Sequence, residues 1–487
     1  MQNPSKKPIV LVILDGFGYR KDQKYNAISK AATPFLDHYQ PVYLNASGTA
    51  VGLPKGFTGN SEVGHNTIGA GRIIKQPLVM INEMIENNTF CDQPLLARRL
   101  LQLKQSGGTL HIIGLLSDAG VHSYAPHLYA LIKCAADIGL KNIIVHPILD
   151  GRDTSPYSAE DFLRPLDLHL QKIPGAKIGS IHGRFYAMDR DRNWERTHKS
   201  FSVLTSPHPK TISWKNILDK SYAIEVSDEY IVPTPVTKES HIKTGDGVII
   251  FNFREDRMRQ LTSLLASLPL EWLIAFVDYD PLVKIDVLID KTPVSNTLLD
   301  ELEAHNKTIF TIAETEKYAH VTYFFSGGRE IKRAKEERVL IPSHKDTNYK
   351  NNPEMAASEI TAAVCNSLKT PKDFYLVNYA NADMVGHTGD ESATIKAVEC
   401  LDKQLKKLYD AVVEKQNGIL IVTADHGNAE QMWDNKSKQS HTQHTTNKVP
   451  FYIISQDTSI QATITELSHI APYILSLMNL PIPKAMR

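Results

Sequence analysis

Short apolar runs recur along the chain between longer stretches with helical spacing. Each run is rich in Val, Ile and Leu and does not alternate with polar residues. Runs of this kind are typical of strands buried on both faces of a parallel sheet. We therefore predict strands at Ile9–Leu14, Leu110–Leu116, Ile143–Leu149, Gly247–Phe253, Trp272–Val277, Phe374–Tyr379, Ile419–Thr423 and Val449–Ile454.

Amphipathic stretches separate these strands. Helices are predicted at Ala125–Ile138, Glu255–Leu268, Glu354–Leu368 and Glu391–Val413. Alternating strands and helices favour an α/β fold with helices on both faces of each sheet. Because 487 residues exceed one ordinary core, we expect two α/β/α domains.

Polar residues follow the predicted strands at repeated places. Asp15 directly follows one strand, Asp425 follows another, and Asp383 lies just beyond a third. In the middle of the chain, polar residues follow three more strands at positions 118–122, 150–153 and 254. Ligands of open α/β sheets bind at the carboxyl ends of the strands. Two sheets, each contributing one wall of a binding site, are indicated.

The strand ends of the first and last thirds of the chain are rich in metal-ligand residue types. The candidate ligands are Asp15, Asp383, His387, Asp425, His426 and His444. Mixed carboxylate and imidazole donors suit Mn²⁺, Zn²⁺ or Co²⁺ better than Ca²⁺, and there are enough for two ions. Taken singly, each Asp–His pair is more often an ordinary loop residue beside a core histidine, and Asp383 with His387 could form only a helical contact. Their number favours a metal centre.

Ser61 lies between Gly59 and Gly64, beside residues that favour a helix. A serine on such a turn can present its hydroxyl near backbone amides that attract anions. Serine alone is a weak nucleophile and needs a base or a metal to activate it. With the metal ligands elsewhere in the chain, Ser61 becomes a candidate nucleophile for phosphoryl transfer rather than an ordinary loop serine.

The middle third of the chain carries arginines near polar strand ends. The candidates are Arg152, Arg184, Arg190, Arg254 and Arg257, together with His122 and Asp153. Arginine binds carboxylate and phosphate oxygens in pairs, so this set predicts a small substrate with several negative charges. Surface ion pairs are the alternative, which Arg190-Asp191-Arg192 alone would favour.

Composition narrows the function classes. The chain has 54 basic and 54 acidic residues, so no global attraction to nucleic acid or an anionic membrane is expected. No apolar run approaches the ~18 residues of a membrane helix, and no targeting segment is evident. We expect a cytoplasmic monomer. Cys91, Cys134, Cys365 and Cys400 lie far apart, and we expect them to be reduced and buried rather than in disulfides or a zinc site.

Six segments carry longer motifs: Asn60–His65, Ile68–Arg72, Asp150–Thr154, Ala313–Tyr318, Asn381–His387 and Thr423–Asn428. Together they closely resemble the cofactor-independent (2,3-bisphosphoglycerate-independent) phosphoglycerate mutases of the alkaline phosphatase superfamily. The match runs in the family's order from Asp15 to His444 and covers nearly the whole chain.

The resemblance implies an alkaline phosphatase-like domain split by an inserted phosphotransferase domain. The discontinuous metal-binding domain would comprise residues 1–75 and 297–487, and the inserted substrate-binding domain residues 76–296. One Mn²⁺ would be bound by Asp383, His387 and His444, and a second by Asp15, Ser61, Asp425 and His426. Mg²⁺ or Co²⁺ could replace Mn²⁺, and no 2,3-bisphosphoglycerate would be needed.

The implied reaction interconverts 3-phosphoglycerate and 2-phosphoglycerate, a step of glycolysis and gluconeogenesis, through a phosphoserine on Ser61. Lys317 would stabilise the phosphoryl group, and Asp153 would exchange protons with the glycerate hydroxyls. The substrate-binding residues would be His122, Arg152, Asp153, Arg184, Arg190, Arg254, Arg257 and Lys317. The alternative is a metal-dependent phosphomonoesterase of the same superfamily, which would not need the inserted domain. A non-catalytic scaffold is disfavoured because no ligand or nucleophile is missing.

Overall fold

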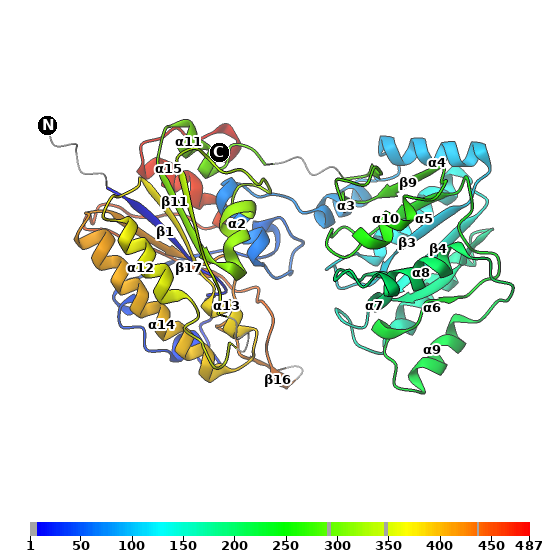
Figure 1. Cartoon of the computed structure of the whole chain (residues 1–487), viewed down its shortest axis with the longest axis horizontal. Helices are drawn as coiled ribbons and strands as arrows, with labels where there is room; N and C mark the ends of the chain where they lie inside the picture. The colour runs from blue at the N-terminus through cyan, green and yellow to red at the C-terminus, as the bar shows by residue number, and fades with distance from the viewer. Residues whose placement is uncertain (1–6, 290–293, 345–348, 436–437) are drawn as a thin grey trace. The chain divides into compact units, whose positions relative to one another are not determined.

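The chain divides into two compact units in the computed structural model, which describes residues 7–289, 294–344, 349–435 and 438–487. The first unit comprises Met1–Gln76 and Pro293–Arg487, and the second comprises Pro77–Thr292. Each unit has its own main sheet. The first unit is therefore built from both ends of the chain (Figure 1).

The main sheet of the first unit has seven strands in the order β12-β11-β13-β1-β14-β17-β2. The strands from β12 to β14 are parallel, while β17 pairs antiparallel with both β14 and β2. The bounds are β1 Ile9–Leu14, β2 Val42–Leu44, β11 Ile309–Glu314, β12 Glu336–Ile341, β13 Phe374–Tyr379, β14 Ile419–Thr423 and β17 Val449–Ile454, with a separate pair β15 Trp433–Asp434 and β16 Gln439–Ser440. Every residue of β1 is buried, because this strand lies in the middle of the sheet.

Helices pack on both faces of this sheet. In Figure 1, α12 and α14 cover one side of the strands and α2 lies on the other, where it contacts α11 and α15. The bounds are α1 Ala27–Lys30, α2 Ser61–Ala70, α11 Leu298–Ala304, α12 Ala357–Ser367, α13 Asn381–Gly386, α14 Glu391–Tyr409 and α15 Ile470–Leu477. Short turns are η1 Leu36–His38, η2 Gly48–Val51, η4 Thr315–Lys317, η7 Leu467–His469 and η8 Lys484–Met486, with π-helical turns at η5 His320–Phe324 and η6 Asp410–Glu414.

The sheet of the second unit follows the order β10-β9-β8-β3-β4-β6-β7, and β5 also pairs with β4. All pairs are parallel except β6 with β7. The strands are β3 Leu110–Leu116, β4 Ile143–Leu149, β5 Ala176–Ile178, β6 Ser180–Gly183, β7 Thr234–Pro235, β8 Gly247–Ile250, β9 Trp272–Ala275 and β10 Asp286–Val287. The helical segments are α3 Pro77–Glu86, α4 Pro94–Ser106, α5 Ala125–Ile138, α6 Ala159–Leu170, α7 Arg184–Ala187, α8 Trp194–Thr205, α9 Trp214–Tyr222, η3 Asp228–Tyr230 and α10 Arg259–Leu265.

Six of the eight predicted strands have the bounds found in the structure, and the other two end early. The strand predicted to reach Phe253 ends at Ile250. Beyond that point the backbone N–H of Leu115 donates to the side-chain oxygen Asn252 Oδ1, at 2.9 Å, and not to a strand carbonyl. The strand predicted to reach Val277 ends at Ala275. The predicted helix Ala125–Ile138 has the same bounds as α5. The other three predicted helices are found in position but differ at one or both ends, most at α10, which is shorter by several residues on each side.

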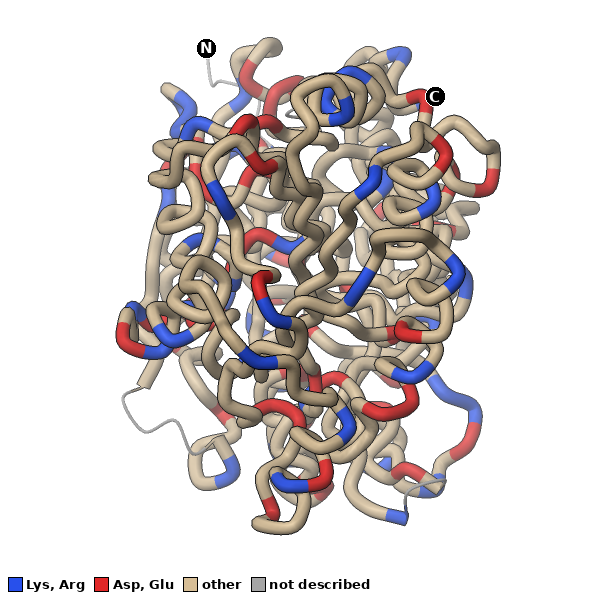
Figure 2. Tube along the Cα trace, turned by 90° about the vertical axis from the view of Figure 1, so that its right-hand side faces the viewer, with Lys and Arg blue, Asp and Glu red and all other residues tan. Residues whose placement is uncertain are grey.

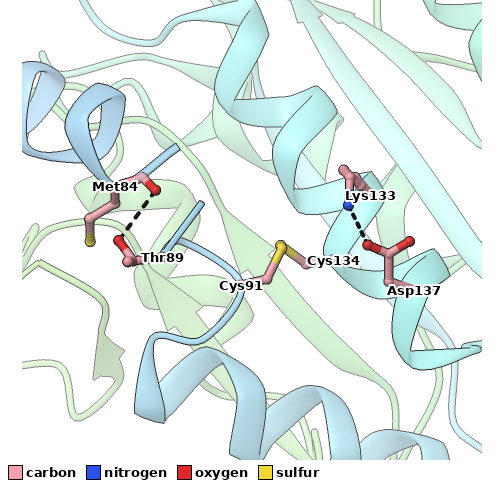
Figure 3. The surroundings of a disulfide bond; sticks show 6 residues. All are labelled: Met84, Thr89, Cys91, Lys133, Cys134 and Asp137. Carbon is pink, nitrogen blue, oxygen red and sulfur yellow. Dashed lines mark hydrogen bonds and ion pairs between the residues drawn. A yellow bond between two sulfur atoms is a disulfide. The ribbon is translucent and has the colours of Figure 1, made fainter. Parts of the chain in front are cut away.

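The expectation that all four cysteines are reduced is wrong for two of them. Cys91 and Cys134 form a disulfide, and only Cys365 and Cys400 are free (Figure 3). Cys91 lies between α3 and α4, and both helices pack against α5, which carries Cys134. The two cysteines are 43 positions apart, so their meeting depends on helix packing that sequence spacing does not reveal.

Charged residues of both signs are interspersed along the described part of the chain. Along the trace in Figure 2, short basic segments alternate with acidic ones, and no long basic run is seen among the described residues. No described helix is long and apolar enough to cross a membrane.

A row of buried polar side chains crosses the sheet of the second unit. His111 Nε2 lies 3.2 Å from Asp246 Oδ2, and His111 Nδ1 lies 2.9 Å from His146 Nε2. Ser180 Oγ continues the row, 2.7 Å from both His146 Nδ1 and His182 Nε2. With ionised Asp246 as the final acceptor, one proton on each imidazole satisfies every contact. Burial lowers the pKa of all three imidazoles, that of His182 to about 3.

This row predicts a loss of stability in acid. The folded pKa of His182 is about 3, whereas an unfolded histidine titrates near pH ~6.5. The unfolded state therefore takes up a proton first as the pH falls, so stability is fully present above pH ~6.5 and lost towards pH ~3. His182 should lower the free energy of unfolding by about 1.4 kcal/mol per pH unit in this window.

Urea unfolding between about pH 7.5 and 5 measures this decline. His182→Gln keeps an N–H donor for Ser180 but cannot titrate in this range, so its stability should fall less steeply. The same pH dependence in the variant and the parent protein would contradict the role of His182.

Candidate functional site

Ser61 is the first residue of α2 and lies at the carboxyl end of the first unit's sheet. Asn60 caps the helix, its side chain accepting a hydrogen bond from Val63 N at 3.0 Å. The Ser61 hydroxyl is buried, 3.0 Å from Asp15 Oδ1 and 3.1 Å from His426 Nε2. The positive end of the helix dipole at this position favours an anion.

Lys317 connects the serine to two carboxylates. Its buried Nζ lies 2.6 Å from Asp15 Oδ1, 2.7 Å from Asp383 Oδ2 and 2.7 Å from Ser61 Oγ. Burial alone would lower the pKa of Lys317, but the two aspartates outweigh it and raise that pKa above its usual range. Burial likewise opposes ionisation of Asp15 and Asp383, yet the lysine keeps the pKa of both carboxyls well below the usual value.

The predicted metal ligands form two clusters. In one, which we call the Asp383 cluster, His387 Nε2 and His444 Nε2 lie 3.2 and 3.3 Å from Asp383 Oδ1. The other is the Asp15 cluster, made by Asp15, Asp425 and His426. In each cluster the candidate ligand atoms all lie within 4.8 Å of one another.

The chemistry of these clusters fits a divalent cation. The two Nε2 atoms of His387 and His444 are only 3.1 Å apart. One N–H facing a lone pair satisfies this contact, and two lone pairs directed at a shared ion satisfy it as well. Asp425 Oδ2 is buried and makes no hydrogen bond among the described residues. Burial opposes a charge on His426, but Asp425 and Asp15 raise its pKa to about 10, which reflects the negative field of the site.

A second cluster of predicted residues lies at the carboxyl end of the second unit's sheet. Arg184 is buried and its Nη1 lies 2.5 Å from Asp150 Oδ1 and 2.6 Å from Asp153 Oδ2. His122 Nε2 is 3.9 Å from Asp153 Oδ2. Burial and then the Arg184 charge lower the pKa of His122 to about 4, so the imidazole is neutral near pH ~7.

Asp256 pairs with two more of the predicted arginines beside the cluster of Arg184, Asp153 and His122. Its carboxylate lies 3.0 Å from Arg190 Nη1 and 3.3 Å from Arg254 Nε. Arg152 instead pairs with Glu229, at 3.3 Å, on a more exposed part of the unit. Arg257 Nη1 lies 3.5 Å from the Met188 carbonyl, and burial followed by the charges of Arg190 and Arg184 lowers its pKa.

Comparison with known proteins places the chain in a family. The Metalloenzyme superfamily model matches residues 7–482. The 2,3-bisphosphoglycerate-independent phosphoglycerate mutase of Legionella pneumophila (strain Corby) is 42% identical over 98% of this chain and 96% of its own. The enzyme of the same name from Clostridioides difficile (strain 630) is 42% identical over 99% and 98%. The chain belongs to the 2,3-bisphosphoglycerate-independent phosphoglycerate mutases.

The fold of this mutase family is also seen in a solved structure. Phosphoglycerate mutase of Leishmania mexicana, crystallised at low cobalt concentration, is 31% identical and covers 100% of this chain and 98% of its own. The two structures superpose with a TM-score of 0.76. The family membership and the fold class predicted from the motifs are thereby confirmed.

Several buried polar residues beside the clusters of this mutase had no role predicted from the sequence. They are His65, Glu314, Asn378 and Asn428. The sequence held one sign of a role for Asn378, because it is the only amide within the apolar run of its strand. In the sheet it is the register partner of Ile13, which precedes Asp15 by two residues. Glu314 ends β11 and burial raises the pKa of its carboxyl.

Proposed function

We propose that this mutase interconverts 3-phosphoglycerate and 2-phosphoglycerate through a phosphoserine on Ser61 at a centre of two Mn²⁺ ions. The observation that carries the proposal is the convergence of Ser61 Oγ, Lys317 Nζ and the carboxylates of Asp15 and Asp383 at the N-terminus of α2. A serine with these neighbours, in a chain of this family, is suited to accept a phosphoryl group.

The two clusters would hold the metal ions. Asp383, His387 and His444 would bind one, and Asp15, Ser61, Asp425 and His426 the other. When bound, the ions supply positive charge that lowers the pKa of the serine hydroxyl and neutralises phosphoryl oxygens. Co²⁺ is a further metal to test because the Leishmania mexicana relative was crystallised at low cobalt concentration, and Mg²⁺ is another because carboxylate oxygens also suit it.

In the proposed reaction Ser61 and Lys317 have different roles. Ser61 Oγ forms a bond to phosphorus while the bond from phosphorus to the C3 oxygen breaks, which leaves glycerate and a phosphoserine. Lys317, charged and beside Ser61 Oγ, stabilises the phosphoryl oxygens in the transition state. In the second transfer the C2 oxygen of glycerate forms a bond to phosphorus while the bond from phosphorus to Ser61 Oγ breaks, so Ser61 is regenerated.

Residues of the second unit would bind the glycerate and transfer protons to and from its hydroxyls. Arg152, Arg184, Arg190, Arg254 and Arg257 would bind its carboxylate and the phosphate oxygens, with His122 as a neutral partner. Asp153 would accept the proton of one glycerate hydroxyl and return a proton to the other. Its contact with Arg184 at 2.6 Å holds its carboxylate in place.

Phosphorus NMR of the purified protein with 3-phosphoglycerate and Mn²⁺ tests the proposal. We expect 2-phosphoglycerate without added 2,3-bisphosphoglycerate, complete loss of turnover with excess chelator, and recovery when Mn²⁺ is restored. Release of inorganic phosphate in place of 2-phosphoglycerate would instead identify a phosphomonoesterase. Activity that depends on added 2,3-bisphosphoglycerate would also contradict the proposal.

A further inference from the structure

Two buried side chains, His65 and Asn378, form a bridge inside the first unit. Asn378 Nδ2 donates to Asp15 Oδ2 at 3.0 Å and lies 3.0 Å from His65 Nε2. His65 Nδ1 is 2.9 Å from the Ser61 carbonyl oxygen and 3.0 Å from Asp425 Oδ2. All of these side chains are buried. The bridge therefore connects the nucleophile's backbone with both carboxylates of the Asp15 cluster.

The neighbours of the bridge fix its hydrogen positions. With its amide reversed, Asn378 would place its oxygen against Asp15 Oδ2, bringing two acceptors together, so the nitrogen must face Asp15. The same NH₂ group then donates to His65 Nε2, which leaves the imidazole proton on Nδ1. That proton points to the Ser61 carbonyl, so Asp425 Oδ2 stays free of hydrogen bonds.

Asn428 has the equivalent place at the Asp383 cluster. Its buried Nδ2 donates to Asp383 Oδ1 at 2.9 Å, and its backbone N–H donates to Glu430 Oε2 at 2.8 Å. A Cβ on Gly386 would lie 2.6 Å from Asn428 Oδ1, so only glycine lets the helix α13 approach this amide. Each metal cluster thus has one carboxylate held by a buried asparagine.

Both asparagines have an unfavourable feature in common. Asn378 Oδ1 and Asn428 Oδ1 are buried and accept no hydrogen bond from the described residues. An unpaired buried acceptor costs about 1–3 kcal/mol, so packing alone does not explain an amide at either position. A neutral N–H donor has a specific use here, because it orients a carboxylate without adding positive charge that would repel a cation.

We propose that Asn378, supported by His65, and Asn428 are positioning residues that each set the metal affinity of a different cluster. The inference depends on the proposed function, in which both clusters bind divalent cations. Asn378 would orient Asp15 for one ion, and Asn428 would orient Asp383 for the other. Loss of such an outer partner lowers metal affinity by about 10- to 100-fold, and here each loss should affect only one of two binding steps.

Titration of the metal-free protein with Mn²⁺, with free Mn²⁺ measured by electron paramagnetic resonance, tests this without an activity assay. Asn378→Ala should weaken one of two binding steps by about 10- to 100-fold, and Asn428→Ala should weaken the other. Asn26→Ala is the matched control, because Asn26 is a buried asparagine of the same unit whose side chain, among the described residues, bonds to backbone atoms of Arg20, Asp22 and Ser29 and to no side chain. It should leave both steps unchanged.

The outcomes separate this inference from the proposed function. If the parent protein binds no Mn²⁺, Co²⁺ or Mg²⁺, the two-metal proposal fails. If the parent protein binds two ions and both variants match it, or each variant weakens both steps equally, the positioning role is refuted. Should Asn378→Ala fail to fold, Asn378→Ser replaces it in the test. The serine side chain is too short to reach both Asp15 and His65, so this variant should weaken the same binding step. His65→Gln should weaken the same step as Asn378→Ala.

Discussion

Replacing Ser61 with alanine should abolish mutase activity, with a fall in turnover of about 10⁴-fold or more, the order expected when a covalent nucleophile is lost. Ser61 Oγ is the only described hydroxyl that contacts Asp15, Lys317 and His426 together. No second hydroxyl among the described residues makes these three contacts, so no other serine or threonine is placed to act in its stead. The fold should survive, because Asp15 and Lys317 remain paired with each other.

Coupled measurement of 2-phosphoglycerate formation checks this result. Labelling with ³²P-phosphoglycerate should give a protein-bound phosphate in the parent protein and none in Ser61→Ala. Ser358→Ala is a suitable control, because within the part of the chain that the structure describes this hydroxyl bonds to Glu359 alone, at the surface of α12. Retained turnover in Ser61→Ala would exclude the serine as nucleophile.

Replacing Lys317 with methionine should reduce activity strongly and also destabilise the metal-free protein. Methionine fills a similar volume but leaves the buried carboxylates of Asp15 and Asp383 without their shared cation. Breaking a buried ion pair by removing one partner costs about 3–5 kcal/mol. Bound metal ions would neutralise the same carboxylates, so the loss of stability should shrink when Mn²⁺ is present.

Thermal unfolding of parent and variant, each with chelator and with Mn²⁺, measures both parts of this effect. Lys30→Met provides the contrast, because Lys30 pairs with Glu391 at the surface and such pairs contribute about 0–1 kcal/mol. An equal destabilisation of Lys317→Met with and without metal would show that Lys317 and the ions do not neutralise the same charges.

The central strands were predictable because they are buried on both faces. The runs Ile9–Leu14, Leu110–Leu116 and Phe374–Tyr379 are apolar throughout or nearly so, and their strands have the same bounds. Short strands such as β2 and β7 were missed, since two or three residues carry no periodicity. The disulfide was missed for a different reason, because it depends on how α5 packs against its neighbours.

The sequence pattern brought several candidate metal ligands together, but it did not reveal their contacts. Asp15 and Asp425 follow adjacent parallel strands, so the sequence pattern already placed them at one sheet edge. The sequence did not reveal that Lys317 bonds to Ser61, because this depends on the short turn that follows β11. Nor did it separate Asn378 from the core residues around it, since hydrogen-bond partners appear only with the sheet register.

The central position of β1 has a consequence for synthesis of the protein. Its two neighbours in the sheet, β13 and β14, lie roughly 360 residues or more further along the chain. At ribosomal rates of about 5–20 residues per second, β1 waits on the order of 20–70 s before either partner exists. During that time an entirely apolar strand of the nascent chain lacks both of its native partners. The growing chain should therefore depend on chaperone protection long after its first residues have left the ribosome.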